Sequence, residues 1–295
     1  MRSTSVSVGR MHPARAPLFC DSALAARIER VEAALIAASS RATRRRRADD
    51  AGFVIPVAGG VASFAEPDSP FNKVAGLGFG GAPTTTELDQ IERAYAAQPS
   101  PVSVELSNLA DPAIASMLTG RGYRLVSYEN VLGRALDPSL ERSIPTGIEV
   151  RPSGDDELGV WLDVITDGFA HPDEQGVPSH EDFPREVIAN ATRDFSAAGV
   201  VRYAALLDGV LVGGGSFRMA DGVAQLAGAA TAPAHRRRGV QTALLAARLA
   251  DAAAAGCDVA VVTTLPGSKS QQNVQRRGFD LLYTRAILVK DALRA

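Results

Sequence analysis

The sequence predicts a mixed α/β fold, built as two similar halves that follow an N-terminal helix. Three observations support this prediction. Strand-like and helix-like patterns alternate from residue 52 to the end of the chain. Two stretches 156 residues apart repeat the same order of elements. The length of 295 residues, with 46% hydrophobic residues, is enough for two globular domains.

The composition excludes several classes of protein. The net charge of −2 gives no global basicity, so we expect no nucleic-acid partner. The sequence has no run of about 20 apolar residues, so we expect no membrane span. The only cysteines, Cys20 and Cys257, cannot form a disulfide framework or a four-thiolate zinc site. These features favour a cytoplasmic protein without a bound metal.

The N-terminal region is expected to hold a disordered tail and one helix. Residues 1–20 lack a continuous apolar segment and are predicted to be poorly ordered. Residues 21–50 are predicted to form a helix over 23–40 and a basic turn, Arg44 to Arg47. The basic run fits either a nucleic-acid patch or a solvated connection after the helix, and its shortness favours the second.

Residues 51–136 are predicted to form the first α/β domain. Thr84 and Glu87 have the spacing of a capping box, which predicts a helix from there to about residue 97. A second helix is expected over 111–118. The expected strands are 53–57, 60–64, 73–79, 102–106, 123–128 and 130–134.

A linker over 137–146, with two prolines, separates this domain from a second one over 147–295. Asp208-Gly209 predicts a tight hairpin turn. The expected helices are 155–169, 179–195, 240–255 and 268–276. The expected strands are 148–151, 200–207, 210–217, 223–231, 259–263, 279–283 and 286–290.

The two domains are expected to be copies of one architecture. Adding 156 to the residue number takes Arg121-Gly122-Tyr123 to Arg277-Gly278-Phe279. The same offset superposes the order helix, strand, helix and two strands over roughly 55 residues without a gap. We interpret this as an internal duplication.

The most informative motif is the segment from Thr231 to Leu245, in which a strand ends, a loop follows and a long helix begins. The N–H groups in the first turn of a helix have no partners within the helix and lie at its positive end. Such a turn binds anions, and Arg236 to Arg238 add positive charge. Gly239 allows close approach of the backbone to a phosphate. The alternative is a solvated basic turn, which the strand-to-helix context disfavours.

This segment resembles the pyrophosphate loop of the GNAT superfamily of acetyl-CoA-dependent N-acyltransferases, which reads Gln/Arg-x-x-Gly-x-Gly/Ala. Arg236 and Gly239 match the pattern, whereas Gln241 departs from it at the final position. The resemblance covers about 147–290 well and about 52–134 in element order only. It implies two GNAT-like mixed-sheet domains packed as a pseudo-dimer. Where the second copy has the loop, the first has Gly80-Gly-Ala-Pro83, so the first copy is expected to bind no cofactor and to wall the substrate cleft.

By this resemblance, the acyl donor is acetyl-CoA. The pyrophosphate would be held by the loop and first helical turn, the pantetheine arm by main chain at the end of the preceding strand, and CoA also by the short last helix. These residues are, in that order, Arg236, Arg237, Arg238, Gly239, Val240, Gln241 and Thr242; Ala229, Ala230 and Thr231; and Ser270 and Asn273. Many members of the family have a general-acid Tyr where this chain has Val274, so Tyr283 is the candidate acid instead.

The resemblance implies transfer of an acetyl group to an amine of a small molecule by direct attack. The candidate bases are His171, His180, Glu181 and Asp182, in or beside the helices that shape the acceptor site in the family. Trp161 and Phe169 are expected to pack in the core rather than stack on substrate. A CoA-binding regulatory or scaffolding protein without turnover and a protein N-acetyltransferase are the alternatives. A monomer or weak homodimer is expected.

Overall fold

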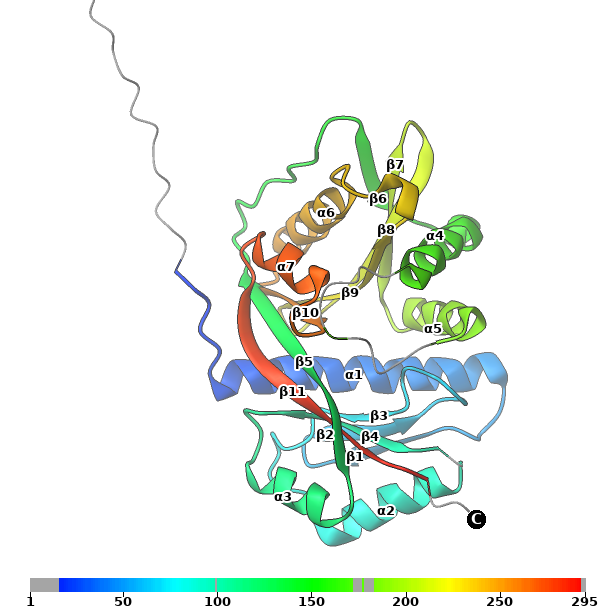
Figure 1. The fold of residues 1–295 in the computed structure, drawn as a ribbon, viewed down its shortest axis with the longest axis vertical. Coiled ribbons are helices and arrows are strands. Elements are labelled where there is room, and N and C mark those ends of the chain that lie inside the picture. Colours follow the sequence, from blue (N-terminus) through cyan, green and yellow to red (C-terminus); the bar gives the residue numbers. More distant parts are fainter. Residues whose placement is uncertain (1–15, 99, 172–176, 178–182, 293–295) are drawn as a thin grey trace, which may run out of the picture.

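The computed structural model describes residues 16–98, 100–171, 177 and 183–292. Eleven of the described segments are strands of one continuous mixed sheet (Figure 1). Their order across the sheet is β1-β2-β3-β4-β11-β5-β10-β9-β8-β7-β6. The strands are β1 (Phe53–Val57), β2 (Gly60–Phe64), β3 (Lys73–Ala75), β4 (Val102–Ser107), β5 (Arg124–Ala135), β6 (Ile148–Pro152), β7 (Val201–Leu207), β8 (Val210–Ala220), β9 (Val223–Thr231), β10 (Val259–Thr264) and β11 (Asp280–Lys290).

Helices cover both faces of this sheet. They are α1 (Ser22–Arg47), α2 (Thr85–Ala96), α3 (Ala113–Gly120), α4 (Leu158–Ala170), α5 (Arg185–Ala197), α6 (Val240–Ala254) and α7 (Lys269–Gln275). On β5, Val131 packs toward α1 and its neighbour Leu132 toward α6, because successive strand residues point to opposite faces. Helix α1 crosses the middle of the molecule, between the lobe of α2 and α3 and the lobe of α4 to α7 (Figure 1).

The two halves have the same order of elements at the offset of 156 residues. Helix α2 corresponds to α6, β4 to β10, α3 to α7, and β5 to β11. Gly122 and Gly278, which precede the last strand of each half, both have positive φ, 88° and 81°. The duplication seen in the sequence is therefore present in the fold.

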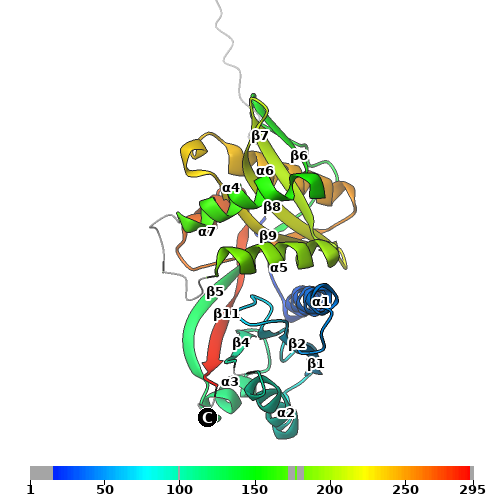
Figure 2. The ribbon, with the colours of Figure 1, turned by 90° about the vertical axis from the view of Figure 1, so that its right-hand side faces the viewer.

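The halves are joined because their last strands are exchanged at the centre of the sheet. β11, from the second half, pairs with β4 of the first half on one side and with β5 on the other. β5, from the first half, also pairs with β10 of the second. Figure 2 shows both strands running from one lobe into the other. The prediction of two short strands in place of each of β5 and β11 was wrong, because each is one long strand that serves both lobes.

Other boundaries also differ from the predicted ones; helix α5, for example, begins at Arg185 and not at residue 179. The strand predicted over 73–79 ends at Ala75, since Gly76 and Gly78 have positive φ and turn the chain. Helix α1 continues through the basic run to Arg47 instead of ending at residue 40. Three of these arginines pair with acidic side chains, at 2.6 Å from Arg44 to Asp50 and 2.7 Å from Arg47 to Asp49, while Arg46 joins Asp194 of α5 at 3.0 Å. The run therefore fastens α1 to its surroundings.

Residues 16–20 are not a disordered tail. The Leu18 amide donates to Asp280 Oδ2 at 2.7 Å, and the Leu18 side chain packs beside Tyr283 and Leu282. These contacts hold the chain just before α1, whose start is capped by Asp21 Oδ1 accepting from the Leu24 amide at 2.8 Å. The rest of the predicted tail, 1–15, lies outside the described residues.

A buried ionic cluster lies where α1 crosses the exchanged strands. Glu29 of α1, 1% exposed, accepts from Arg285 Nε at 2.7 Å and from the Tyr283 hydroxyl at 2.8 Å. Arg285, 2% exposed, also reaches Glu105 of β4 at 3.4 Å. Because removal of one partner from a buried pair leaves an uncompensated charge, this cluster fixes the relative positions of α1, β4 and β11.

Candidate active site

Strands β9 and β10 run in parallel and then part. They pair from Val223 with Val259 to Leu226 with Val262. Beyond this point β9 continues to Thr231 beside β8, and β10 continues to Thr264 beside β5. A bulge at Gly228, where φ is 24°, accompanies the divergence. The edge of β9 that faces β10 is therefore without a strand partner over Ala227 to Thr231.

The predicted anion loop follows directly from this open edge. After β9, a short 3₁₀ turn over Pro233–His235 leads to Gly239, the N-cap of α6. The φ of Gly239 is 86°, so this position requires glycine for its backbone conformation. A Cβ on Gly239 would lie 3.4 Å from Pro145 Cγ, an ordinary contact, so the conformation and not crowding selects glycine.

The N–H groups of this loop are left without partners. No side chain caps α6, and no hydrogen bond within the described part of the chain uses the amides from Arg237 to Thr242. Arg237 adopts a φ of 62°, which strains a residue with a Cβ. The side chains of Arg237 and Arg238 are exposed. Six consecutive unpaired amides therefore lie at the positive end of a 15-residue helix, beside two exposed cations, an arrangement whose charge favours an anion.

Arg236 has a different position from its neighbours. Its Nη2 donates to the carbonyl oxygens of Gly168 at 3.0 Å and His171 at 2.6 Å, at the C-terminus of α4. These are carbonyls that a helix end leaves unpaired, and a cation there also opposes the negative end of the dipole. The structure thus shows Arg236 joining the loop to α4. Its guanidinium is therefore engaged by main-chain carbonyl oxygens of α4 in this structure.

Gln241 and Thr242 are held by side-chain hydrogen bonds on either side of the loop. Gln241 Nε2 donates to Thr231 Oγ1 at 3.0 Å, so its side chain folds back onto the end of β9. Thr242 Oγ1 accepts from Arg277 Nη2 at 2.7 Å. The departure from the family pattern at Gln241 is accommodated because the side chain lies along β9.

Helix α7 presents the two further residues expected to contact CoA. Ser270 and Asn273 are both exposed and stand three residues apart on this helix. Nearby, Thr264 at the end of β10 is 6% exposed, and its Oγ1 has no hydrogen-bond partner. Because β9 and β10 are parallel, the C-terminal end of β10 lies at the same end of the sheet as the loop.

Tyr283 lies away from this end. It is 3% exposed, donates its hydroxyl to Glu29, and packs with α1 residues on the face of the sheet opposite α6. Burial and the nearby carboxylate of Glu29 raise its pKa well above the usual value. The hypothesis that Tyr283 is the general acid does not fit this geometry. Tyr283 is part of the buried cluster that holds α1.

Of the candidate bases, the structure describes only His171. Its Nδ1 lies 2.9 Å from the Asp167 carbonyl oxygen and its side chain is exposed at the end of α4. His180, Glu181 and Asp182 lie outside the described residues. Within the described part of the chain, no group of three His, Cys, Asp or Glu side chains is placed to hold a metal, and no helix is long and apolar enough to cross a membrane.

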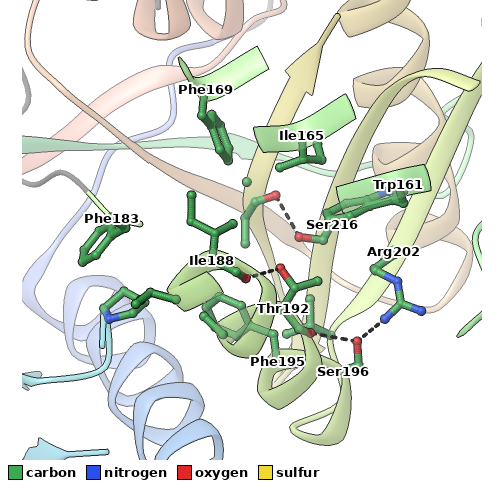
Figure 3. A pocket seen from close by; sticks show the side chains of 16 residues that line it. Trp161, Ile165, Phe169, Phe183, Ile188, Thr192, Phe195, Ser196, Arg202 and Ser216 are labelled. Atoms are coloured by element: carbon green, nitrogen blue, oxygen red, sulfur yellow. Dashed lines mark hydrogen bonds between the residues drawn. The ribbon is translucent and has the colours of Figure 1, made fainter. Parts of the chain in front are cut away.

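A cavity of about 130 Å³ lies between β9 and the helices α4 and α5, next to the Gly228 bulge (Figure 3). It is enclosed by α4, α5, the strands β7 to β9, and Pro70 of the first half. Sequence reasoning missed it, and it assigned Trp161 and Phe169 to core packing. Both line the cavity, although Trp161 is also a core residue, 3% exposed. The sequence feature that could have revealed the cavity is the helical spacing of Ile188, Ala191 and Phe195, which places them on one apolar face of α5.

Comparisons with known proteins agree with this geometry. Residues 166–279 match the sequence model of the Acetyltransferase (GNAT) family. A GCN5-related N-acetyltransferase from Kribbella flavida is similar in structure, with a TM-score of 0.61 and 22% identity over 88% of this chain and 95% of that one. A tandem GNAT protein from the clavulanic acid biosynthesis pathway has a TM-score of 0.58 and 14% identity, over 87% and 88%. No curated protein matches the sequence.

The matched segment contains the diverging strands, the loop with unpaired amides and helices α6 and α7. The similarity to the tandem protein extends through the first half, so both copies have the same fold. Residues 166–279 are therefore similar in sequence to the GNAT acetyltransferase family, and the chain as a whole has the fold of a tandem GNAT protein.

Proposed function

We propose that the second half binds acetyl-CoA and transfers its acetyl group to the amine of a small molecule. The observation that carries this proposal is the run of unpaired amides from Arg237 to Thr242 at the start of α6. A diphosphate supplies the acceptor oxygens that these donors lack, and its charge is favoured by the helix dipole. Arg237 and Arg238 add charge-assisted contacts.

The remaining residues fit the rest of the donor. The free edge of β9 over Ala229, Ala230 and Thr231 offers main-chain groups to the pantetheine arm, and Ser270 and Asn273 offer side chains. In the reaction, the amine nitrogen attacks the thioester carbon, the carbon–sulfur bond breaks, the nitrogen loses a proton to water, and the thiolate of CoA takes one up. Bringing the two reactants together on the enzyme lowers the barrier.

A small acceptor is supported by the volume of the cavity beside the proposed thioester position, about 130 Å³. The first half narrows it further through Pro70. The two cysteines, both unpaired, support a reducing compartment such as the cytoplasm. The exchange of β5 and β11 completes the sheet within one chain and supports a monomer or weak homodimer.

The loop assignment is tested with Gly239→Glu, measured by calorimetric titration with acetyl-CoA. A glutamate at the N-cap places a carboxylate among the amides, so we expect binding to be lost while the circular dichroism spectrum is unchanged. Gly81→Glu is the matched control, because Gly81 also has a positive φ, 94°, with nothing within 4 Å of its Cβ position. Unchanged binding in Gly239→Glu would refute the assignment.

A CoA-binding protein without turnover is the second candidate, because the structure buries Tyr283 and thereby removes the candidate acid. Thiol release from acetyl-CoA across a panel of amines separates the two. Release with any amine above the rate with acetyl-CoA alone supports the enzyme. Tight acetyl-CoA binding with no release from any amine supports the second candidate.

A further inference from the structure

The cavity beside the diverging strands has a composition that selects among amines. Its wall is largely aromatic and aliphatic, and none of the described residues that line it is a carboxylate. Figure 3 shows these apolar side chains gathered between α4 and α5. They include Trp161, Ile165, Phe169, Ile188 and Phe195. Such a wall favours a hydrocarbon body and provides no counter-charge for a second ammonium group.

Among the described residues of the wall, the one charged side chain is a cation. Arg202 is 5% exposed, donates Nη2 to Asp155 Oδ1 at 2.7 Å, and also donates to Ser196 Oγ. Its Nε is buried without a hydrogen-bond partner. By contrast, the wall hydroxyls of Thr192 and Ser216 each donate to a carbonyl oxygen, at 2.8 Å and 3.1 Å. A second cation at this end would meet a guanidinium that is already partly desolvated.

The strand register gives the cavity a direction. Arg202 on β7 pairs with Ser216 on β8, which pairs with Ala227 on β9. Neighbouring strands lie about 4.8 Å apart, so Arg202 is about 10 Å across the sheet from Ala227. The Ala227 end adjoins the Gly228 bulge and the free edge of β9, where the thioester is proposed to lie. The cavity therefore extends from the reaction centre toward Arg202.

The volume of the cavity limits the size of the apolar part of an acceptor. An engineered apolar cavity of about 150 Å³ binds benzene, and this cavity measures about 130 Å³. It accommodates about one ring. The first half contributes Pro70 to the wall, and Phe71 next to it packs edge-on against the wall residue Phe195 with ring centroids 4.9 Å apart.

From these observations we infer that the acceptor is a monoamine carried on an apolar body of about one ring, and that Arg202 excludes amines with a second cationic group at the opposite end. This inference rests on the proposed function, because it assigns the amine to the end of the cavity that adjoins the thioester. It adds the chemical class of the acceptor and a residue that determines specificity.

The test compares two probes with the same body, benzylamine and 1,4-bis(aminomethyl)benzene. The second adds a single ammonium group at the opposite end of the ring. Trp161 is the only tryptophan of the chain and lines the cavity, so its fluorescence reports occupancy without any need for acetyl-CoA. We expect benzylamine to change the fluorescence with an affinity at least tenfold higher than the diamine. Equal or tighter binding of the diamine would overturn the inference.

Variants of residues in the cavity wall test whether the amine probes bind in this cavity. Ile188→Ala enlarges the cavity and is expected to shift preference from benzylamine toward 1-naphthylmethylamine. Val160→Ala is the matched control, because Val160 is 57% exposed on α4 and is not part of the wall. Arg202→Gln is expected to reduce the discrimination against the diamine, a change that a general loss of stability would not produce. If none of these variants changes the preference, the inference fails.

Thiol release separates this inference from the proposed function. Release with benzylamine above that with the diamine supports both. Fluorescence binding of benzylamine without release from any amine overturns the proposed function alone. Release with polycationic amines but not with benzylamine supports the proposed function and overturns the inference.

Discussion

The beginnings of helices α2 and α6 occupy equivalent positions in the two halves, yet side chains cap the first turn of α2 and no side chain caps that of α6. At α2, Thr84 Oγ1 accepts from the Glu87 amide at 3.2 Å, and Glu87 Oε2 accepts from the Thr84 amide at 2.7 Å. This is the capping box predicted from the sequence, and the structure confirms it. At α6, Gly239 has no side chain with which to cap.

The loops before these helices differ in the same way. In the first half, the amides of Gly78 and Gly80 both donate to the Ala58 carbonyl oxygen at 3.0 Å, so the chain satisfies its own donors. A Cβ on Gly80 would lie 2.8 Å from the Gly59 nitrogen, so the loop is filled by backbone. The first copy thus pairs its amides with a carboxylate and a carbonyl of its own, whereas the amides from Arg237 to Thr242 in the second copy have no partner within the described part of the chain.

The largest expected effect comes from giving α6 the carboxylate that α2 has. Thr242→Glu places a glutamate at the third helical position, as Glu87 is in α2. We expect acetyl-CoA affinity to fall about 100-fold, which is about 2.7 kcal/mol, while Arg277 can pair with the new carboxylate and preserve stability. Calorimetric titration measures this. Thr242→Val, which adds no charge, should change the affinity far less, and equal losses would contradict the charge argument.

A smaller effect is expected at Arg236, which has no counterpart in the first loop. Arg236→Ala leaves the Gly168 and His171 carbonyl oxygens without this donor. We expect the free energy of unfolding to fall by about 1–2 kcal/mol, and acetyl-CoA affinity to fall less than in Thr242→Glu. Urea denaturation measures the change in the free energy of unfolding. Arg238→Ala is the control, because Arg238 is exposed and, within the described part of the chain, its side chain has one hydrogen-bond contact, with His235 at 3.4 Å. An equal loss there would rule out the proposed role of Arg236.

Removing the side-chain cap of α2 should lower the stability of the protein without creating an acetyl-CoA site. Thr84→Ala removes the cap of α2, and we expect a loss of about 1 kcal/mol. Thr85→Ala, one residue further on and exposed, is expected to have little effect. Acetyl-CoA affinity should be unchanged in both variants. A change in affinity on removal of the Thr84 cap would show that the first half contributes to binding.

The smallest effect concerns the central region that both halves share. Burial raises the pKa of Glu32 of α1 from its ordinary value of 4.5, and Gln225 Nε2 donates to its carboxyl group. The folded state then retains a proton that the unfolded chain has lost, so stability falls as the pH rises above about 4.5. Glu32→Gln should reduce this fall. Urea denaturation from pH 4 to pH 8 tests it, and parallel profiles would contradict it.

Short-range sequence patterns predicted much of the fold. The capping box at Thr84, the hairpin at Asp208-Gly209 and the internal duplication are all visible over a few residues or at one fixed offset. The anion loop belongs to this group, because a strand, an arginine, a glycine and a helix follow each other along the chain. Nearest neighbours in sequence determine such features, so periodicity and turn chemistry suffice.

The positions of two predicted site residues, Tyr283 and Arg236, depend on distant partners. Tyr283 alternates on a strand like any exposed tyrosine, and only the crossing of α1, with Glu29 at a separation of 254 residues, buries it. Arg236 matches the motif, but its hydrogen-bond acceptors lie 65 and 68 residues away at the end of α4. Neither partner can be read from local spacing.

The sequence by itself determined the fold class, the duplication and the glycine loop that opens α6 without a side-chain cap, because each follows from short-range backbone and helix-end chemistry. Tertiary structure alone decided the exchange of β5 and β11, the burial of Tyr283 and the apolar cavity that Pro70 closes. These depend on which distant surfaces meet. That choice is made by the burial of apolar surface across the whole sheet and not by any single segment.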